Sequence, residues 1–243
     1  MKPLRWEIVF EDKDCMVINK PAGLLCIPDR YDELKANLQT ELSQVREEIF
    51  VVHRLDRETS GLIIFAKNQE THAFLNQQFQ DQKVNKLYHA FVNGVPAWEH
   101  KISEESIVYL NHGKSGVGKG GKKSKTEFNV IKRWKSFSLI ECKPHTGRTH
   151  QIRVHLQDLG HPLIVDRMYG TRGIFKISEI KGRRKFHLKK DSQERPLLSR
   201  HTLHAKELEL ILKPGGKRQK FIQDYPKDLR ALENQLNKLD KRS

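Results

Sequence analysis

A short charged segment between two apolar runs has the residue types for acid–base or nucleophilic chemistry, in IFVVHRLDRETSGLIIFAK at 49–67. Asp56 lies there between Arg54 and Arg57, and cations close by favour the ionised form of a carboxyl group. An ionised carboxylate can act as a nucleophile or a base, and loops held by buried strands often carry catalytic groups. Asp56 is therefore a candidate catalytic residue, against the alternative of an ion-paired strand connection without chemistry.

A second polar cluster follows a strand-like run, in CKPHTGRTHQIRVHLQDLGHP at 142–162. We predict a helix whose first turns carry Arg148, His150, Gln151 and Arg153. The exposed amides of a helix N-terminus, together with arginines, suit anions. Arg148 and Arg153 should point to different faces of this helix, so that one pairs with a carboxylate while the other meets phosphate. The alternative is a solvated polar helix face.

A segment rich in glycine and lysine, at 111–125, suggests nucleotide binding at first sight. Two overlapping stretches fit the first seven positions of a phosphate-binding loop. Both lack the Ser or Thr hydroxyl that must hold magnesium at the eighth position, where Gly120 and Lys123 stand. We interpret this segment and 171–195 as mobile, basic loops inserted into a single body.

Neither a metal site nor a disulfide framework is indicated. No CxxC pair is formed by the three cysteines, Cys15, Cys26 and Cys142. Acidic or cysteine partners at ligand spacing are missing beside the histidine pairs 150/155 and 201/204. Since no signal peptide or membrane-length apolar run is present either, we expect a cytoplasmic protein without a metal or a membrane partner.

The chain of 243 residues carries a formal net charge of +15. Residues 101–243 hold 33 lysines and arginines against 15 acidic residues, whereas residues 1–100 hold 12 against 15. Such an excess attracts polyanions. Aromatic residues such as Trp134 and Phe137 persist in the basic half, unlike in a histone or a basic tail. The sequence therefore predicts a folded protein with one side that binds nucleic acid.

Strand-like runs outnumber helical ones. Their β-branched and aromatic content predicts strands at 6–11, 15–20, 48–52, 61–67, 86–95 and 136–144. Helical spacing of apolar residues indicates helices at 69–80, at 148–160 and through the leucines from Leu229 to Leu239. The mixture favours an α+β body over a regular parallel α/β fold, and we expect a single domain over residues 1–243.

Four motifs stand in a fixed order along the chain. They are Lys20-Pro21-Ala22-Gly23; His53-Arg54-Leu55-Asp56 continuing through Thr59-Ser60-Gly61-Leu62; Lys86-x-Tyr88-x-Ala90-x-Val92-x-Gly94; and Pro144-x-Thr146-Gly147-Arg148-Thr149-His150-Gln151-Ile152-Arg153-Val154-His155. Further matches follow at Gly160-x-Pro162, Asp166, Tyr169-Gly170 and Leu203-His204-Ala205. In this order the motifs resemble the RluA-type family of RNA pseudouridine synthases.

The resemblance implies isomerisation of uridine within RNA, without a cofactor or a metal: the N1–C1′ bond is cut, the uracil turns, and a C5–C1′ bond forms. Asp56 matches the family's essential carboxylate. It could attack C1′, add to the base at C6 or remove the C2′ proton, and the sequence does not choose among these. The family pattern implies that Arg153 pairs with Asp56 and that Tyr88 stacks on the uracil and helps to remove the C5 proton.

A stacked base must leave its stack before its glycosidic bond can be reached, at a cost of about a few kcal/mol. Arg54 matches the family arginine that inserts where the base was, and its planar guanidinium can stack there. The catalytic candidates are thus Asp56, Tyr88 and Arg153. The substrate-binding candidates are Arg54, His53, Arg148 and His150.

The chain departs from the family pattern at some positions. Val165 stands before Asp166 where a Gly is usual, and the Lys-Pro-Ala-Gly motif begins at residue 20, which leaves no room for the small S4-type RNA-binding domain of many relatives. The resemblance further implies a mixed or antiparallel sheet with flanking helices and a central active-site cleft. We expect a monomer that acts on structured RNA, either tRNA or large-subunit rRNA. The alternative function is a non-catalytic RNA-binding or ribosome-assembly factor of the same fold.

Overall fold

The computed structural model describes residues 6–111, 113–181 and 193–240. The chain forms two compact units, each built from segments that are distant in the sequence. Unit 1 consists of residues 1–88 and 204–224, and unit 2 of residues 89–203 and 225–243. The sequence did not indicate this division, and the single domain expected over the whole chain stays a prediction.

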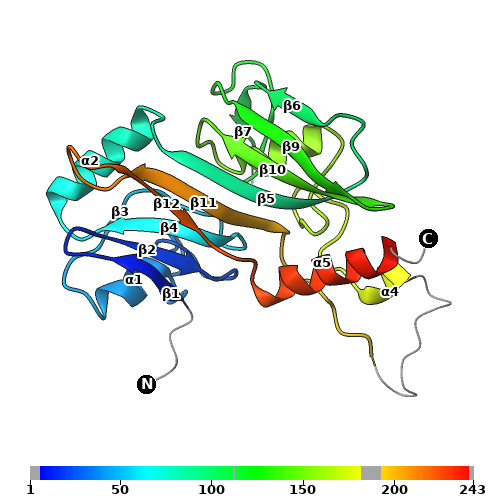
Figure 1. Ribbon diagram of the computed structural model, residues 1–243, viewed down its shortest axis with the longest axis horizontal. Coiled ribbons are helices and arrows are strands. Elements are labelled where there is room, and N and C mark those ends of the chain that lie inside the picture. Colours follow the sequence, from blue (N-terminus) through cyan, green and yellow to red (C-terminus); the bar gives the residue numbers. More distant parts are fainter. Residues whose placement is uncertain (1–5, 112, 182–192, 241–243) are drawn as a thin grey trace. The chain divides into compact units, whose positions relative to one another are not determined.

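Unit 1 contains a mixed sheet flanked by helices. Its elements are β1 (Glu7–Glu11), β2 (Cys15–Lys20), α1 (Leu38–Ser43), β3 (Phe50–Val51), β4 (Ser60–Ala66), α2 (Gln69–Gln80), the first part of β5 (Asn85–Asn93), most of β11 (Leu203–Ile211) and β12 (Arg218–Ile222). β1, β2 and β4 are antiparallel neighbours, β11 lies parallel to β4, and β12 and β3 pair antiparallel with β11 and β4 (Figure 1). These pairings confirm the predicted α+β class with a mixed sheet.

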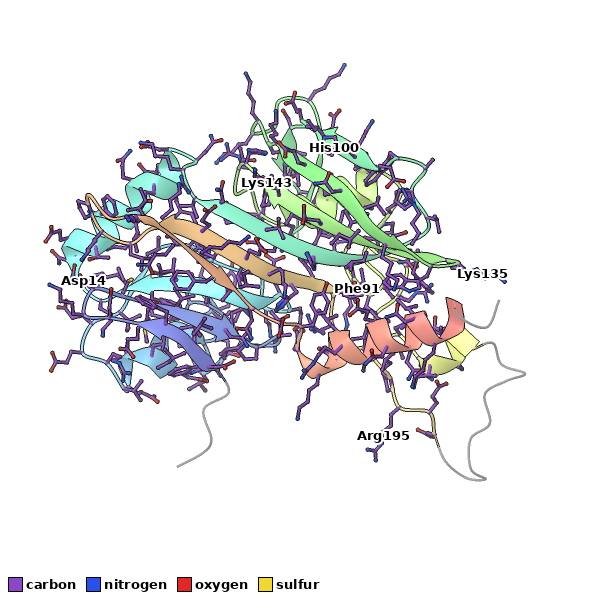
Figure 2. All side chains as sticks on the ribbon, in the orientation of Figure 1. Asp14, Phe91, His100, Lys135, Lys143 and Arg195 are labelled. Atoms are coloured by element: carbon purple, nitrogen blue, oxygen red, sulfur yellow. The ribbon has the colours of Figure 1, made fainter. Side chains whose placement is uncertain are left out.

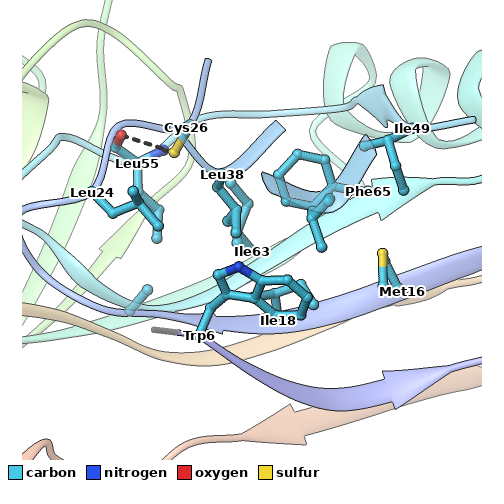
Figure 3. Close-up of a cluster of buried hydrophobic side chains, with 12 residues drawn as sticks. Trp6, Met16, Ile18, Leu24, Cys26, Leu38, Ile49, Leu55, Ile63 and Phe65 are labelled. Carbon is cyan, nitrogen blue, oxygen red and sulfur yellow. Dashed lines mark hydrogen bonds between the residues drawn. The ribbon is translucent and has the colours of Figure 1, made fainter. Parts of the chain in front are cut away.

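The central strands β2 and β4 are buried on both faces, which explains their unbroken apolar runs. Successive residues of a strand point to opposite faces. On one face, Met16 and Ile18 of β2 pack in a cluster with Leu38 of α1 (Figure 3). On the other face, Val17 packs in a cluster with Leu75 of α2. The two helices therefore cover opposite sides of the strands that carry the first two motifs.

The parallel strands β4 and β11 approach closely at Gly61. Their register places Ser60 beside His204 and Gly61 beside Ala205. A Cβ on residue 61 would stand 2.2 Å from the Ala205 carbonyl oxygen, and the φ of +111° there also favours glycine. The hydroxyl of Ser60 lies 2.9 Å from Nδ1 of His204 and joins the same two strands. Packing therefore requires a glycine at this motif position.

Unit 2 contains an antiparallel ladder, a separate hairpin and further helices. Its elements are the last part of β5, β6 (His100–Ser103), β7 (Ile107–Tyr109), β8 (Ser115–Val117), β9 (Thr126–Arg133), β10 (Phe137–Pro144), α3 (Gln151–Asp158), α4 (Ile177–Lys181) and α5 (Lys227–Asp240). β6, β9 and β10 form the ladder, and β7 pairs with β8. Phe91 of β5, labelled in Figure 2, packs in a core cluster with the predicted leucine stripe of α5, Leu229, Leu232 and Leu236.

Parts of the two segments expected as loops have regular structure. In 111–125, residues 115–117 form β8, and Lys122 exchanges two main-chain hydrogen bonds with Ile107, of 2.9 and 3.0 Å. In 171–195, Phe175 is fully buried and α4 follows it, while residues 182–192 lie outside the described part of the chain. The loop interpretation is wrong for β8 and α4, because Val117 of β8 and Ile180 of α4, together with Phe175 just before α4, pack in core clusters although the segments are otherwise polar.

Candidate active site

Asp56 lies on the connection from β3 to β4 in unit 1. The backbone turns at this point, where the Thr59 N–H donates to the Asp56 carbonyl oxygen at 3.1 Å. Leu55 is buried, Asp56 is partly buried, and Arg54 is exposed. The turn therefore packs Leu55 into the core and leaves the neighbouring charged side chains within reach of solvent.

The Lys20–Gly23 loop holds this connection through main-chain groups. The side chain of Lys20 is fully buried, and its ammonium donates to the carbonyl oxygens of Pro21 (2.9 Å), Leu24 (2.8 Å) and Arg57 (3.0 Å). The Gly23 N–H donates to the Arg57 carbonyl at 2.9 Å, and Nε of Arg57 donates to the Gly23 carbonyl at 3.1 Å. A buried ammonium needs such acceptors, so Lys20 fastens the first two motifs together.

Cys26 makes a second connection to the same turn. Its thiol donates to the Leu55 carbonyl and accepts from the Leu55 N–H, both at 3.2 Å (Figure 3). Burial raises the pKa of this thiol, so it stays protonated and can make both bonds. The main chain that directly precedes Asp56 is thereby fixed to the core of unit 1.

Tyr88 of β5 packs against the core cluster that contains Leu55 and Cys26. Burial raises the pKa of its phenol, and the negative charge of Asp56 raises that pKa further. The hydroxyl of Tyr88 is therefore protonated at neutral pH. It can donate a hydrogen bond, but it is not a ready base.

His53 is packed against the helix that covers the sheet. Its ring stacks on Phe79 of α2, with the centroids 4.7 Å apart and the planes inclined by 22°. Its Nε2 accepts the Ile64 N–H at 3.2 Å, and burial lowers its pKa to about 3. His53 is therefore neutral and helps to hold the turn. Its expected part in substrate binding stays a prediction.

α3 begins at Gln151 rather than at Arg148. His150 has a left-handed φ of 57°, which interrupts the helical path. Arg148 and His150 therefore lie on the turn before the helix, and the expectation that its first turns carry them is wrong. Oε1 of Gln151 accepts from the Arg148 N–H (3.0 Å) and from the Thr146 hydroxyl (2.7 Å), so a side chain beyond the turn shapes it.

Arg153 and Asp166 form a buried ion pair within unit 2. Nε of Arg153 donates to Oδ2 at 2.7 Å and Nη2 donates to Oδ1 at 2.9 Å, and the two side chains are 6% and 1% exposed. Oδ1 also accepts the main-chain N–H groups of Met168 (2.9 Å) and Tyr169 (3.1 Å). Burial alone would raise the pKa of Asp166, but the hydrogen bonds and charge of Arg153 outweigh it and hold that pKa below its usual value.

The phenol of Tyr169 connects three parts of unit 2. The guanidinium carbon of Arg153 lies over its ring, 4.8 Å from the centroid. Its hydroxyl accepts the Ser115 N–H of β8 at 2.8 Å and lies 2.8 Å from Nδ1 of His150. The β7–β8 hairpin, the turn before α3 and the Asp166 turn therefore meet at one side chain.

Arg148 lies beside a group of exposed lysines. Its side chain is exposed, and its Nε donates to the Lys123 carbonyl at 3.0 Å. Four exposed lysines of 111–125 make no ion pair with any other described residue: Lys114, Lys119, Lys122 and Lys123. We call these four the hairpin lysines. Their charge is available to an anionic partner.

The candidates are divided between the two units. Unit 1 holds Asp56, Tyr88, Arg54 and His53, and unit 2 holds Arg153, Arg148 and His150. The pairing of Arg153 with Asp56, which the family pattern implies, stays a prediction. Four further side chains that support the site were not among the sequence candidates: Lys20, Cys26, Asp166 and Tyr169. Lys20, Asp166 and Tyr169 belong to the family motifs, which could have indicated them, whereas no feature of the sequence indicated Cys26.

Among the described residues, no three His, Cys, Asp or Glu side chains gather in a way that could hold a metal ion. Within the same residues, no helix has the length and apolarity that a membrane crossing needs.

Comparison with known proteins identifies the family. Residues 14–158 match the family model described as RNA pseudouridylate synthase. The dual-specificity RNA pseudouridine synthase RluA of Vibrio vulnificus is 39% identical over 186 residues, which cover 71% of this chain and 72% of that protein. The chain belongs to the RluA-type RNA pseudouridine synthases. Ribosomal large subunit pseudouridine synthase D of Zymomonas mobilis is 34% identical to this synthase over 238 residues, 93% of the chain and 71% of the relative.

Solved structures confirm the fold of the synthase. Human RNA pseudouridylate synthase domain containing 4 aligns with a TM-score of 0.71 at 23% identity, over 95% of this chain and 92% of that chain. Human RNA pseudouridylate synthase domain containing 1 gives a TM-score of 0.69 at 24% identity, over 98% and 97%. The family and the activity that the motifs implied are thus confirmed: the synthase isomerises uridine in RNA.

Proposed function

We propose that this synthase modifies specific uridines in tRNA or large-subunit rRNA, with Asp56 as its catalytic carboxylate. The observation that carries the proposal is the fixation of the turn on both sides of Asp56. Cys26 holds the main chain of Leu55, and Lys20 holds the carbonyl of Arg57. A reacting group gains most from a fixed position, whereas an ion-paired connection without chemistry has no such need.

The names of the relatives support the choice of RNA. The Zymomonas relative is named for the ribosomal large subunit, and the Vibrio relative is named for dual specificity. We propose large-subunit rRNA and tRNA as the two substrate classes to test for this chain.

Asp56 has three chemical routes open to it. It can attack C1′ of the ribose, add to C6 of the base, or take the C2′ proton to give a glycal. In each case the N1–C1′ bond breaks, the uracil turns, and a C5–C1′ bond forms. C5 then loses its hydrogen and N1 ends protonated, so the product is an isomer of uridine and no co-reactant is consumed.

Tyr88 is proposed to stack on the uracil and to take part in the last proton transfer. Because its raised pKa keeps the phenol protonated, Tyr88 serves as a hydrogen-bond donor, and the C5 proton needs another acceptor. The Asp56 carboxylate, once released from the sugar or base, is an acceptor of suitable basicity. Arg153 is proposed to pair with Asp56 and to hold it in the ionised form in which it starts the reaction.

RNA binding is proposed to use two kinds of group. Arg54 is exposed at the turn, where a planar guanidinium can take the place of a flipped base. The hairpin lysines and Arg148 supply charge to the phosphates, which makes affinity depend on salt. His150, on the same turn as Arg148, is proposed to contact the substrate, and we expect the synthase to act as a monomer.

Tritium release from RNA labelled at uridine C5 tests the function, because C5 loses its hydrogen when pseudouridine forms. Unmodified tRNA and rRNA are assayed separately, with Asp56→Asn as the control. Release from one class by the wild-type protein, and none by Asp56→Asn that still binds the RNA, supports the proposal and names the substrate. Full activity in Asp56→Asn overturns the role of Asp56. Salt-sensitive binding without release from either RNA would favour a non-catalytic RNA-binding or ribosome-assembly factor.

A further inference from the structure

The guanidinium of Arg153 is held within unit 2 by two hydrogen bonds to the Asp166 carboxylate and by the ring of Tyr169. We propose that Asp166 and Tyr169 are positioning residues for the isomerisation, which fix the guanidinium of Arg153 in one orientation. This inference rests on the proposed role of Arg153 beside the catalytic carboxylate. It adds Asp166 and Tyr169 as the side chains that support Arg153 in that role.

Asp166 fixes the direction of the guanidinium. It binds the edge formed by Nε and Nη2, at 2.7 and 2.9 Å. Rotation about the last bonds of Arg153 would break two charge-assisted hydrogen bonds at once. Asp166 is itself fixed, since its carboxylate accepts the N–H groups of Met168 and Tyr169 and its carbonyl accepts the Gly170 N–H at 2.9 Å.

Tyr169 fixes the plane of the guanidinium. The ring lies 4.8 Å from the guanidinium carbon, in position for cation–π stacking. The ring cannot tilt freely, because its hydroxyl is bound by the Ser115 N–H and lies 2.8 Å from Nδ1 of His150. The main chain of Tyr169 is also part of the turn from Asp166 to Gly170. This turn is closely packed, because a Cβ added at Gly170 would stand 2.8 Å from the Asp166 carbonyl oxygen.

A second arginine pair in unit 2 has the same fork geometry and a different setting. Nε and Nη2 of Arg200 bind Asp228 at 2.7 and 2.9 Å, and the two side chains are 6% and 35% exposed. Nη1 of Arg200 bonds the main-chain carbonyls of His201 (3.2 Å) and Leu203 (3.4 Å). That pair ties the chain to the start of α5. It is therefore a matched control for the loss of an ion pair without loss of positioning.

A fixed cation matters more for turnover than for RNA binding. A guanidinium that is free to turn keeps its charge and still attracts RNA. It no longer holds the Asp56 carboxylate in its ionised, oriented form. Loosening Arg153 should therefore lower kcat while KM for RNA stays nearly constant, and should move the acid limb of the kcat–pH profile to higher pH.

The experiment compares Asp166→Asn, Tyr169→Leu and Asp228→Asn on the C5-tritiated RNA that gives release with the wild-type protein. For Asp166→Asn and Tyr169→Leu we expect kcat to fall about 10- to 100-fold, with KM within about threefold and the acid limb shifted upward. Asp228→Asn should keep kcat and the pH profile, whatever it does to thermal stability. An equal fall of kcat in all three variants would overturn the inference, because a general loss of packing would then explain it.

A coupling test separates positioning from any independent effect of Asp166. In the background of Arg153→Lys, which keeps the charge and loses the fork, Asp166→Asn should cause little further loss of kcat. A full second loss in that background would show that Asp166 does not act through Arg153.

The outcomes also separate this inference from the proposed function. If Arg153→Lys keeps the wild-type kcat and pH profile, Arg153 has no role in the reaction. Its proposed pairing with Asp56 and its positioning by Asp166 and Tyr169 would then both be wrong. An impaired Arg153→Lys beside normal Asp166→Asn and Tyr169→Leu would overturn the positioning inference alone. If Asp166→Asn does not fold, Tyr169→Leu decides, because it leaves the ion pair in place.

Discussion

The thiol of Cys26 and the main chain of Leu55 exchange two hydrogen bonds, each 3.2 Å long, across 29 residues of sequence. The Cys26 side chain therefore satisfies both the N–H and the C=O of Leu55, as a neighbouring strand does in a sheet. Because Leu55 directly precedes Asp56, loss of this pairing should change the Asp56 turn first.

Cys26→Val should lower turnover and stability. The variant replaces the thiol with a somewhat larger apolar group and leaves the buried N–H and C=O of Leu55 without partners, at about 1–3 kcal/mol for each group. Cys26→Ser, which can still donate and accept, should keep most of kcat. Urea unfolding and tritium release measure the two effects, with Cys142→Val as a control at a buried thiol of unit 2. A Cys26→Val protein with wild-type kcat would contradict the expectation.

Arg153→Ala should abolish activity and lower the free energy of unfolding by about 3–5 kcal/mol, because it leaves the Asp166 carboxylate buried without its cation. Replacing both partners with leucine should restore much of that stability and none of the activity. Chemical denaturation and the C5 release assay test both statements. Wild-type stability in Arg153→Ala would show that Asp166 finds another partner.

Stability should fall in mild acid because of His53. Its pKa in the folded protein is about 3, below the ordinary value of 6.5, so the unfolded chain binds a proton that the folded protein refuses. The stability that neutral His53 provides is complete above pH 6.5 and is lost as the pH falls towards 3. By pH 5 the loss approaches about 2 kcal/mol. His53→Gln should flatten this dependence in urea titrations, and an equally steep fall of stability in that variant would show that another group causes it.

Replacing the hairpin lysines with glutamine should weaken RNA binding and reduce its salt dependence. Each lost phosphate contact should lower the slope of log K against log salt by about one, with kcat at saturating RNA retained. Deleting 114–123 is a harsher change, since it removes Ser115, which bonds the Tyr169 hydroxyl. The deletion should therefore reduce kcat as well. An unchanged salt slope in the lysine variant would show that these side chains do not meet phosphate.

Local signals in the sequence predicted the elements with strong periodicity or clear caps. α2 has the predicted bounds, because Asn68 caps its N-terminus and accepts the Thr71 N–H at 2.8 Å. β11 was missed although Glu207, Leu208, Glu209 and Leu210 alternate as in a half-buried strand, because Lys, Glu and Leu are intrinsically strong helix formers. β7 and β8 were hidden by the glycines and lysines around them, and α1 is only six residues long.

The motifs named the candidate catalytic residues, and the structure was needed to find the side chains that hold them. Arg153 and Asp166 are 13 residues apart, on a helix and a following turn, with no period that relates them. The bond between Ser115 and Tyr169 spans 54 residues and uses a main-chain N–H, which no residue type announces. The left-handed backbone of His150, directly before α3, likewise has no signal in the residue types around it.

The contact of Gly61 with Ala205 has a consequence for synthesis on the ribosome. The Ser60–Gly61 edge of β4 pairs with β11, which is translated about 140 residues later, an interval of roughly ten to thirty seconds at typical elongation rates. During that time the nascent chain presents an unpaired strand edge, the kind of template on which other chains add. Ribosomes that stall before residue 204 should therefore yield fragments that aggregate, and full-length yield should improve when chaperones cover the growing chain over that interval.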